Sequence, residues 1–194
     1  KVPNWDAFMF ITSMCQTADG TVFVGTGDSR DFGEYSFVGG RGVWYQTPGS
    51  STWELVPGTA NTNTGELVTS GINNTIFFCG PSQGLKRWTI GDASATSLGT
   101  EIGLPSGNCS EVEISRDGQV ILAYHQTGSR TSVSNDSGAS FTLVSGGNPG
   151  NIPNGSGSRF EYAISRNRVN GEYVVYAAGT TSWTGGVFRS SDSG

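Results

Sequence analysis

The segment between Asp28 and Gly40 contains the residues best suited to contact a ligand. Aromatic faces stack on sugar rings and peptide side chains, and neighbouring charges help to orient the ligand. We therefore expect a binding loop here, with the alternative that the loop folds back on its own aromatic residues. Its candidate ligand-contacting residues are Arg30, Phe32, Tyr35 and Phe37, and Asp31 and Glu34 add further charge.

The sequence offers little for nucleophilic or metal chemistry. His125 is the only histidine, and we expect it to be hydrogen-bonded at a strand end. Cys15, Cys79 and Cys109 are spaced too widely for a zinc site, so we expect no metal and no cofactor. Cys79 ends the apolar run 75–79, which predicts a buried thiol in the core. A disulfide between Cys15 or Cys109 and another cysteine is the alternative.

Other functional classes lack their sequence signals. No Gly-x-Ser-x-Gly elbow precedes a helix, and Gly25-x-Gly27 is too short for a dinucleotide-binding fingerprint. The formal net charge is -5 and no basic stripe is visible, so we expect no nucleic-acid partner. No apolar segment reaches the roughly 20 residues of a membrane span, and no signal peptide is recognisable. We therefore expect no membrane insertion.

A repeated hairpin supplies the elements that must position these residues. Each repeat has an apolar strand, a turn and a second apolar strand that ends in small residues. The four turns are predicted at Asp19-Gly20, Asn73-Asn74, Asp117-Gly118 and Asn170-Gly171. Such pairs suit two-residue hairpin turns in which both residues have positive φ. The residues after the turns are separated by intervals of 54, 44 and 53 residues.

This period predicts an all-β fold, a β-propeller of four-stranded antiparallel blades. Only 14% of the residues are charged while 35% are hydrophobic, and 30 glycines indicate many tight turns. A β-sandwich also uses short strands and frequent turns, and is the alternative. We expect one partial propeller domain over residues 1–194, with about three and a half blades. The expected blades span 8–58, 64–104, 109–146 and 158–194, the last being incomplete.

A second motif follows the third strand of the third repeat. Residues 134–141 read Ser-Asn-Asp-Ser-Gly-Ala-Ser-Phe, which matches the pattern S-x-D-x-G-x-[ST]-[WF] through Ser134, Asp136, Gly138 and Phe141. The carboxylate can accept hydrogen bonds from its own turn, and the glycine permits positive φ. The final residues match the first fixed positions through Ser190, Asp192 and Gly194. In the first repeat, only Thr52 and Trp53 match the pattern, at its last two positions.

These features resemble the Asp-box (BNR-type) β-propeller superfamily. It includes sialidases, sortilin-type receptors, xyloglucan-cleaving glycosidases, photosystem assembly factors and large exported bacterial proteins. The likeness is strongest to the sortilin-like and xyloglucanase-like exported bacterial proteins, through Gly25-Thr26-Gly27-Asp28 and the run Arg41-Gly42-Val43-Trp44-Tyr45. The resemblance implies that Asp136 and Asp192 belong to structural turns on the outer rim. Function must then come from other residues.

The resemblance also suggests one catalytic candidate. The xyloglucan-cleaving group uses two separated aspartates as acid and base, and Asp28 lies near the position of one of them. The alternative is that Asp28 closes its loop. A sialidase is disfavoured because Val2-Pro3 and Ile152-Pro153 lack the arginine of the Arg-Ile-Pro motif.

The resulting functional expectation is a non-catalytic binding or scaffold propeller that engages glycans or proteins. We expect a secreted or cell-surface protein whose parent chain continues into further blades. One alternative is a glycoside hydrolase that acts on polysaccharide. The other is a propeller of a phage virion or tail fibre.

Overall fold

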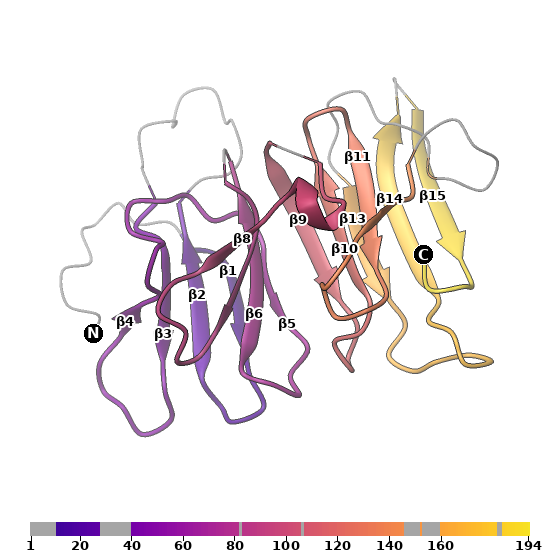
Figure 1. The fold of residues 1–194 in the computed structure, drawn as a ribbon. Helices are drawn as coiled ribbons and strands as arrows, with labels where there is room; N and C mark the ends of the chain where they lie inside the picture. Colours follow the sequence, from indigo (N-terminus) through magenta and orange to yellow (C-terminus); the bar gives the residue numbers. More distant parts are fainter. Residues whose placement is uncertain are drawn as a thin grey trace.

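The computed structural model describes residues 11–27, 40–81, 83–105, 107–145, 152, 160–181 and 184–194. Their strands form four antiparallel sheets that lie side by side in chain order (Figure 1). The predicted all-β fold of propeller blades is confirmed. Each sheet is called a blade below, and the blades are numbered 1 to 4 in chain order. Blades 1 to 3 have four strands each, and the described part of blade 4 has three.

The strands of each blade pair in sequence order, as expected for consecutive hairpins. The bounds of the strands are β1 (Ile11–Gln16), β2 (Val22–Thr26), β3 (Val43–Gln46), β4 (Glu54–Leu55), β5 (Leu67–Thr69), β6 (Thr75–Gly80), β7 (Gly84–Thr89), β8 (Thr96–Leu98), β9 (Cys109–Ile114), β10 (Ile121–His125), β11 (Arg130–Ser134), β12 (Thr142–Leu143), β13 (Phe160–Ile164), β14 (Val175–Thr181) and β15 (Thr184–Ser190). A short 3₁₀ helix, η1 (Thr100–Ile102), follows β8. No helix in the described ranges is long and apolar enough to cross a membrane.

The first strand of each blade contacts the first strand of the next, in the order β1, β5, β9 and β13. We call these the inner strands. The last strands β4, β8 and β12 form the opposite edges of blades 1 to 3 and have only two or three residues each. Because strand direction alternates, the turns within the β1–β2 and β3–β4 hairpins lie at one end of a blade. The β2–β3 connection lies at the other end.

Side chains of the second strands of blades 2 and 3 are buried on both faces. Every residue of β10 is buried, as are residues 76–80 of β6. This burial follows from the stacking of the blades, because each of these two strands has a blade on either side. A continuous apolar run rather than strict alternation is the sequence signal of such a strand.

The core consists of three apolar clusters, and each cluster joins two neighbouring blades. Phe23, Val43 and Val56 of blade 1 pack on Leu67, Ile76, Phe78 and Trp88 of blade 2. Blades 2 and 3 meet through Phe77, Cys79, Leu85, Leu104, Cys109, Val112, Ile121, Ala123 and Phe141. Blades 3 and 4 meet through Val120, Leu122, Tyr124, Val133, Phe160, Tyr162, Tyr173, Val175 and Ala177. Apolar burial between blades therefore holds the sheets together.

The predicted two-residue hairpin turn occurs only at Asn170-Gly171. There φ is 55° and 89°, and Val169 and Glu172 exchange both backbone hydrogen bonds. The prediction is wrong at the other three turns. Gly20 and Gly118 have positive φ but the aspartates before them do not, and in blade 2 the positive φ belongs to Gly71.

Side-chain hydrogen bonds explain the longer turns at Asp19 and Asp117. The Asp19 Oδ1 atom accepts hydrogen bonds from the Thr17 hydroxyl at 2.6 Å and from the Thr21 N–H at 3.0 Å. Asp117 Oδ1 accepts equivalent bonds from Ser115 Oγ at 2.7 Å and Gln119 N–H at 3.1 Å. A carboxylate that accepts hydrogen bonds from groups of its own turn favours a three- or four-residue loop with a single left-handed glycine.

Candidate functional site

The predicted ligand-contacting residues fall in a segment outside the described residues. Asp28, Arg30, Phe32, Tyr35 and Phe37 all lie within residues 28–39, between the end of β2 and Gly40. The structure describes the two residues that flank this segment, Gly27 and Gly40. We call these two glycines and Asn63, which contacts both, the neck of the 28–39 loop.

The neck holds the two ends of the loop in direct contact. A Cβ atom placed on Gly27 would lie 2.7 Å from Gly40 Cα and 2.6 Å from Asn63 Oδ1. Gly27 also has a φ of 110°, which residues with a side chain rarely adopt. The N–H of Gly40 donates a hydrogen bond to Asn63 Oδ1. Glycine is therefore required at both ends by the close approach of the backbone.

Hydrogen bonds tie the neck to blades 1 and 2. Thr26 Oγ1 accepts a hydrogen bond from the Arg41 N–H at 2.8 Å and donates one to the Gly42 carbonyl at 2.7 Å. The Thr64 N–H donates to the Thr26 carbonyl at 2.9 Å. From blade 2, Gln83 Nε2 donates to the Asn63 carbonyl at 2.9 Å. The loop therefore starts and ends on a backbone that two blades fix.

A second group of polar side chains lies on the inner strands. Ser13 Oγ on β1 donates to Glu66 Oε1, just before β5, at 3.1 Å. Burial, together with the negative charge of Glu66, raises the pKa of Glu113 on β9 to about 7. A carboxyl group that titrates near neutrality can act as a proton donor or acceptor. At neutral pH the protonated and ionised forms of Glu113 are therefore both populated.

Burial, aided by the same charge, keeps the nearby thiol of Cys15 protonated. Burial, and then the charge of Glu66, raise the pKa of Cys15 to about 12. The thiolate is the nucleophilic form of cysteine, so Cys15 is a poor nucleophile at neutral pH. Glu66 and Glu113 were not among the predicted site residues. The sequence feature that could have indicated Glu113 is the position of this carboxylate between two apolar residues, Val112 and Ile114, of a strand.

The expectation of a hydrogen-bonded His125 is wrong. His125 ends β10 and is fully buried, and neither ring nitrogen has a hydrogen-bond partner among the residues that the structure describes. Burial lowers its pKa to about 4, so the ring is neutral at physiological pH. It lies opposite Cys109 in the β9–β10 ladder. The expected burial of Cys79 is confirmed, and all three cysteines are free, so the alternative disulfide is not formed.

The motif residues of blade 3 come together at the turn after β11. Ser134 Oγ donates to Asp136 Oδ1 at 2.8 Å and accepts from the Gly138 N–H at the same distance. Asp136 Oδ1 also accepts from the Ser140 N–H at 2.9 Å, while Asp136 Oδ2 accepts from the Ser140 hydroxyl at 2.5 Å. The bonds from Ser140 and Ser134 lower the pKa of Asp136 to about 2. These hydrogen bonds all lie within residues 134–140, so they stabilise the turn.

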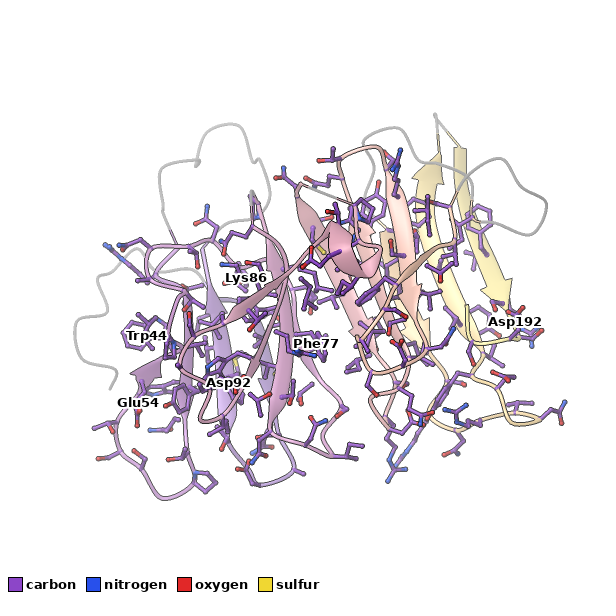
Figure 2. The ribbon with its side chains drawn as sticks, viewed as in Figure 1. Trp44, Glu54, Phe77, Lys86, Asp92 and Asp192 are labelled. Carbon is purple, nitrogen blue, oxygen red and sulfur yellow. The ribbon has the colours of Figure 1, made fainter. Side chains whose placement is uncertain are left out.

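The turn after β15 repeats this arrangement at the lower end of blade 4 in the view of Figure 2, where Asp192 is labelled. Ser190 Oγ donates to Asp192 Oδ1 and accepts from the Gly194 N–H at 3.0 Å. These turns lie at the opposite end of the blades from the neck, because β2 runs toward the neck and β11 runs away from that end. In the described ranges, no group of three His, Cys, Asp or Glu side chains is placed to hold a metal ion.

No protein-family model matches this sequence, and no curated protein sequence matches it. Solved structures share its fold. YCF48 from Cyanidioschyzon merolae superposes with a TM-score of 0.57 at 12% identity, over 92% of this chain and 49% of that chain. An auxiliary nutrient binding protein from Bacteroides thetaiotaomicron gives 0.59 at 13% identity, over 92% of this chain and 46% of that chain.

The computationally designed Ika4 protein gives a TM-score of 0.60 at 10% identity, over 98% of this chain and 94% of that chain. These comparisons establish the β-propeller fold. The chain spans about half the length of YCF48 and of the nutrient binding protein.

Proposed function

We propose that this chain is a non-catalytic binding or scaffold propeller that engages a glycan or a protein through the 28–39 loop. The observation that carries the proposal is the neck, in which Gly27, Gly40 and Asn63 fix both ends of the loop. A loop with fixed ends has less conformational freedom to lose when a ligand binds. Binding loops are commonly mounted on a rigid scaffold in this way.

The composition of the loop supports a role in recognition. Phe32, Tyr35 and Phe37 offer aromatic faces, and Arg30 offers a planar cation for carboxylate or hydroxyl groups. Aromatic stacking on the apolar faces of a sugar ring combines with hydrogen bonding at its hydroxyl groups. We further propose that the protein acts outside the cell, as a secreted or surface protein. The same fold occurs in a protein described as an auxiliary nutrient binding protein.

The test is a binding screen against a glycan array and a panel of extracellular proteins. Substitutions Phe32→Ala, Tyr35→Ala and Phe37→Ala should each weaken binding at least about tenfold if the aromatic faces stack on the ligand. Arg116→Ala is the matched control, because Arg116 is exposed in the β9–β10 turn at the opposite end of the blades. All variants should keep the thermal midpoint of the wild type. Unchanged binding in all three aromatic variants would contradict the proposal.

A glycoside hydrolase is the second candidate function, and the pKa of Glu113 favours it. A carboxyl group whose pKa is about 7 can be protonated at neutral pH, as the acid of a glycosidase pair must be. Asp28 is the candidate for the second carboxylate. Inverting enzymes hold their two carboxyl groups roughly 6.5–9.5 Å apart, which leaves space for water between them.

Sugar release from soluble polysaccharides distinguishes the two functions. If the chain is a hydrolase, Asp28→Asn and Glu113→Gln should each abolish release, while Glu161→Gln, an exposed carboxylate on β13, should not. Release that depends on Asp28 would refute the non-catalytic proposal. Glycan binding without any release, and with full affinity in both variants, would refute the hydrolase.

A further inference from the structure

Two of the three cysteines lie next to each other in the interface between blades 2 and 3. Cys79 is the last residue but one of β6, and Cys109 is the first residue of β9. Each is 1% exposed, and both belong to the apolar cluster that joins these two blades. The strands β6 and β9 are themselves in contact. Each of two neighbouring blades therefore contributes one thiol to the same buried place.

The two thiols interact directly. Burial, and then a hydrogen bond between the two side chains, raises the pKa of Cys79 well above its usual value. The Cys109 Sγ atom also donates a hydrogen bond to the Glu111 carbonyl at 3.6 Å. Both thiols are reduced in this structure. An S–S bond is about 2.0 Å long, so the two sulfur atoms must move closer than in the hydrogen bond to form a disulfide.

The third cysteine belongs to another interface. Cys15 lies on β1 and packs against the cluster between blades 1 and 2. The sequence leaves the partner of Cys109 open, and the structure places Cys79 beside it. Removal of Cys15 therefore leaves the pair of Cys79 and Cys109 complete.

The pair is adjacent to the neck of the 28–39 loop. The Cys79 carbonyl accepts a hydrogen bond from the Gly65 N–H at 2.7 Å. The next residue, Gly80, is so close to the neck that a Cβ atom placed on it would lie 2.1 Å from the Asn63 carbonyl oxygen. The end of β6 thus supports the neck from blade 2.

We propose that Cys79 and Cys109 form a disulfide under oxidising conditions, as a redox-controlled cross-link between blade 3 and the part of blade 2 that supports the neck. The bond closes a loop over residues 79–109, which restricts the unfolded chain. It also ties the end of β6 to β9 covalently, so local opening beside the neck becomes rarer. Disulfides persist in secreted and surface proteins, which is the location proposed above. The bond forms whatever ligand the loop binds, so the inference goes beyond the proposed function.

A small disulfide such as oxidised glutathione is the oxidant. The thiolate of one cysteine attacks the glutathione disulfide, which forms a mixed disulfide and releases one glutathione thiolate. The thiolate of the other cysteine then attacks the protein sulfur of the mixed disulfide and releases the second glutathione thiolate. The two protein thiols lose two protons and two electrons, and both glutathione molecules leave as thiols.

Burial determines when this exchange takes place. The thiolate is the reactive form of cysteine, and both sulfur atoms are shielded from solvent in the folded protein. We therefore expect the bond to form while the chain folds, before blades 2 and 3 close over the pair. Once the bond has formed, the same packing shields it from reductants.

Refolding of the full chain from urea in a glutathione redox buffer, and separately with a reductant, tests the proposal. After alkylation and proteolysis, mass spectrometry of the oxidised sample should find Cys79 linked to Cys109 and Cys15 free. The oxidised protein should have a thermal midpoint about 5–10 °C above that of the reduced protein. Hydrogen exchange at Gly65 and Gly80 should slow. Free thiols at Cys79 and Cys109 after oxidative refolding, or a cross-link of either to Cys15, would overturn the proposal.

Three variants separate the cross-link from other effects of oxidation. Cys15→Ala is the matched control, and it should form the cross-link and show the full rise in thermal midpoint. Cys79→Ala and Cys109→Ala should each have the same midpoint with and without glutathione, and a rise that persists in either would overturn the proposal. If these variants do not fold, the position of the cross-link in the wild type still decides the outcome. Ligand binding is measured in neither experiment, so a negative result here leaves the proposed function of the loop unaffected.

Discussion

Thr131 and Tyr162 share a hydrogen bond of 2.8 Å between their hydroxyl groups across the interface of blades 3 and 4. Both residues are buried, and burial is the largest cause of the raised pKa of Tyr162. The bond is a buried polar contact beside the apolar cluster of this interface, and the more exposed ion pair between Arg168 and Asp117 at 3.0 Å also joins the two blades. The bond between the hydroxyl groups also fixes which pair of positions on β11 and β13 face each other.

Loss of this bond should destabilise the protein. Tyr162→Phe leaves the Thr131 hydroxyl buried without its partner, so we expect the free energy of unfolding to fall by about 1–2 kcal/mol. A double-mutant cycle with Thr131→Val, measured by chemical denaturation, should give a coupling energy of about 1 kcal/mol. Tyr176→Phe is the control on an exposed tyrosine of β14 and should change stability by less than about 0.5 kcal/mol. If the stability changes of Tyr162→Phe and Thr131→Val add exactly in the double variant, the two hydroxyl groups do not stabilise the protein through their hydrogen bond.

His125 should make stability depend on pH. Its pKa is about 4 in the folded protein and near 6.5 in an unfolded chain, so the unfolded state binds more protons between these values. The stability present above pH 6.5 should therefore decline by up to about 3 kcal/mol as the pH falls to 4. Urea unfolding of the wild type and of His125→Leu across this range checks the expectation. The variant should show a shallower decline, and parallel profiles would show that His125 is not the cause.

Asp136 should contribute stability that is lost in acid. The hydrogen bonds from Ser140 and Ser134 keep its folded pKa at about 2, below the unfolded value near 3.9. Its contribution is therefore complete above about pH 5 and is lost as the pH falls toward 2. Because the side chain is exposed, we expect Asp136→Asn to cost only about 0.5–1 kcal/mol at pH 7. The difference from the wild type should vanish near pH 2, and denaturation with Glu161→Gln as control tests this.

The neck should tolerate no side chain at Gly27. A Cβ atom there would meet both Gly40 and Asn63 at 2.7 Å or less, and the φ of 110° adds backbone strain. We expect Gly27→Ala to cost at least about 2 kcal/mol. Gly71→Ala should cost only about 1 kcal/mol, because Gly71 has a φ of 74° but nothing within 4 Å of its added Cβ. Thermal unfolding of both variants measures the difference. Equal losses of stability would mean that the close contact of the added Cβ with Gly40 and Asn63 does not add to the cost of Gly27→Ala.

Short-range features of this fold could be predicted from the sequence, and features that depend on distant partners could not. The blades follow from the hairpin period, and the turn at Asn170-Gly171 follows from residues that tolerate positive φ. At Asp19 and Asp117 the aspartate was expected to take positive φ. Its side chain instead accepts hydrogen bonds from residues two positions away and lengthens the turn.

In the candidate site, too, the features that depend on distant partners could not be predicted. The role of Asn63 depends on a residue 23 positions away, Gly40, and no local pattern indicates that contact. The pKa of Glu113 depends on burial between blades and on Glu66, which belongs to another blade. His125 illustrates the reverse error. A polar residue at a strand end is expected to be hydrogen-bonded, but His125 is buried in the folded protein with no hydrogen-bond partner in the described part of the chain.

The apolar core is divided among three separate interfaces, each shared by two adjacent blades. Cooperativity in such a molecule is set by coupling between neighbours, as in a one-dimensional chain of units. Blades 2 and 3 are each held by two interfaces and blades 1 and 4 by one in the described ranges. Amide hydrogens of β6 and β10, which have a blade on either side, will therefore exchange more slowly than those of the two-residue edge strands β4 and β12.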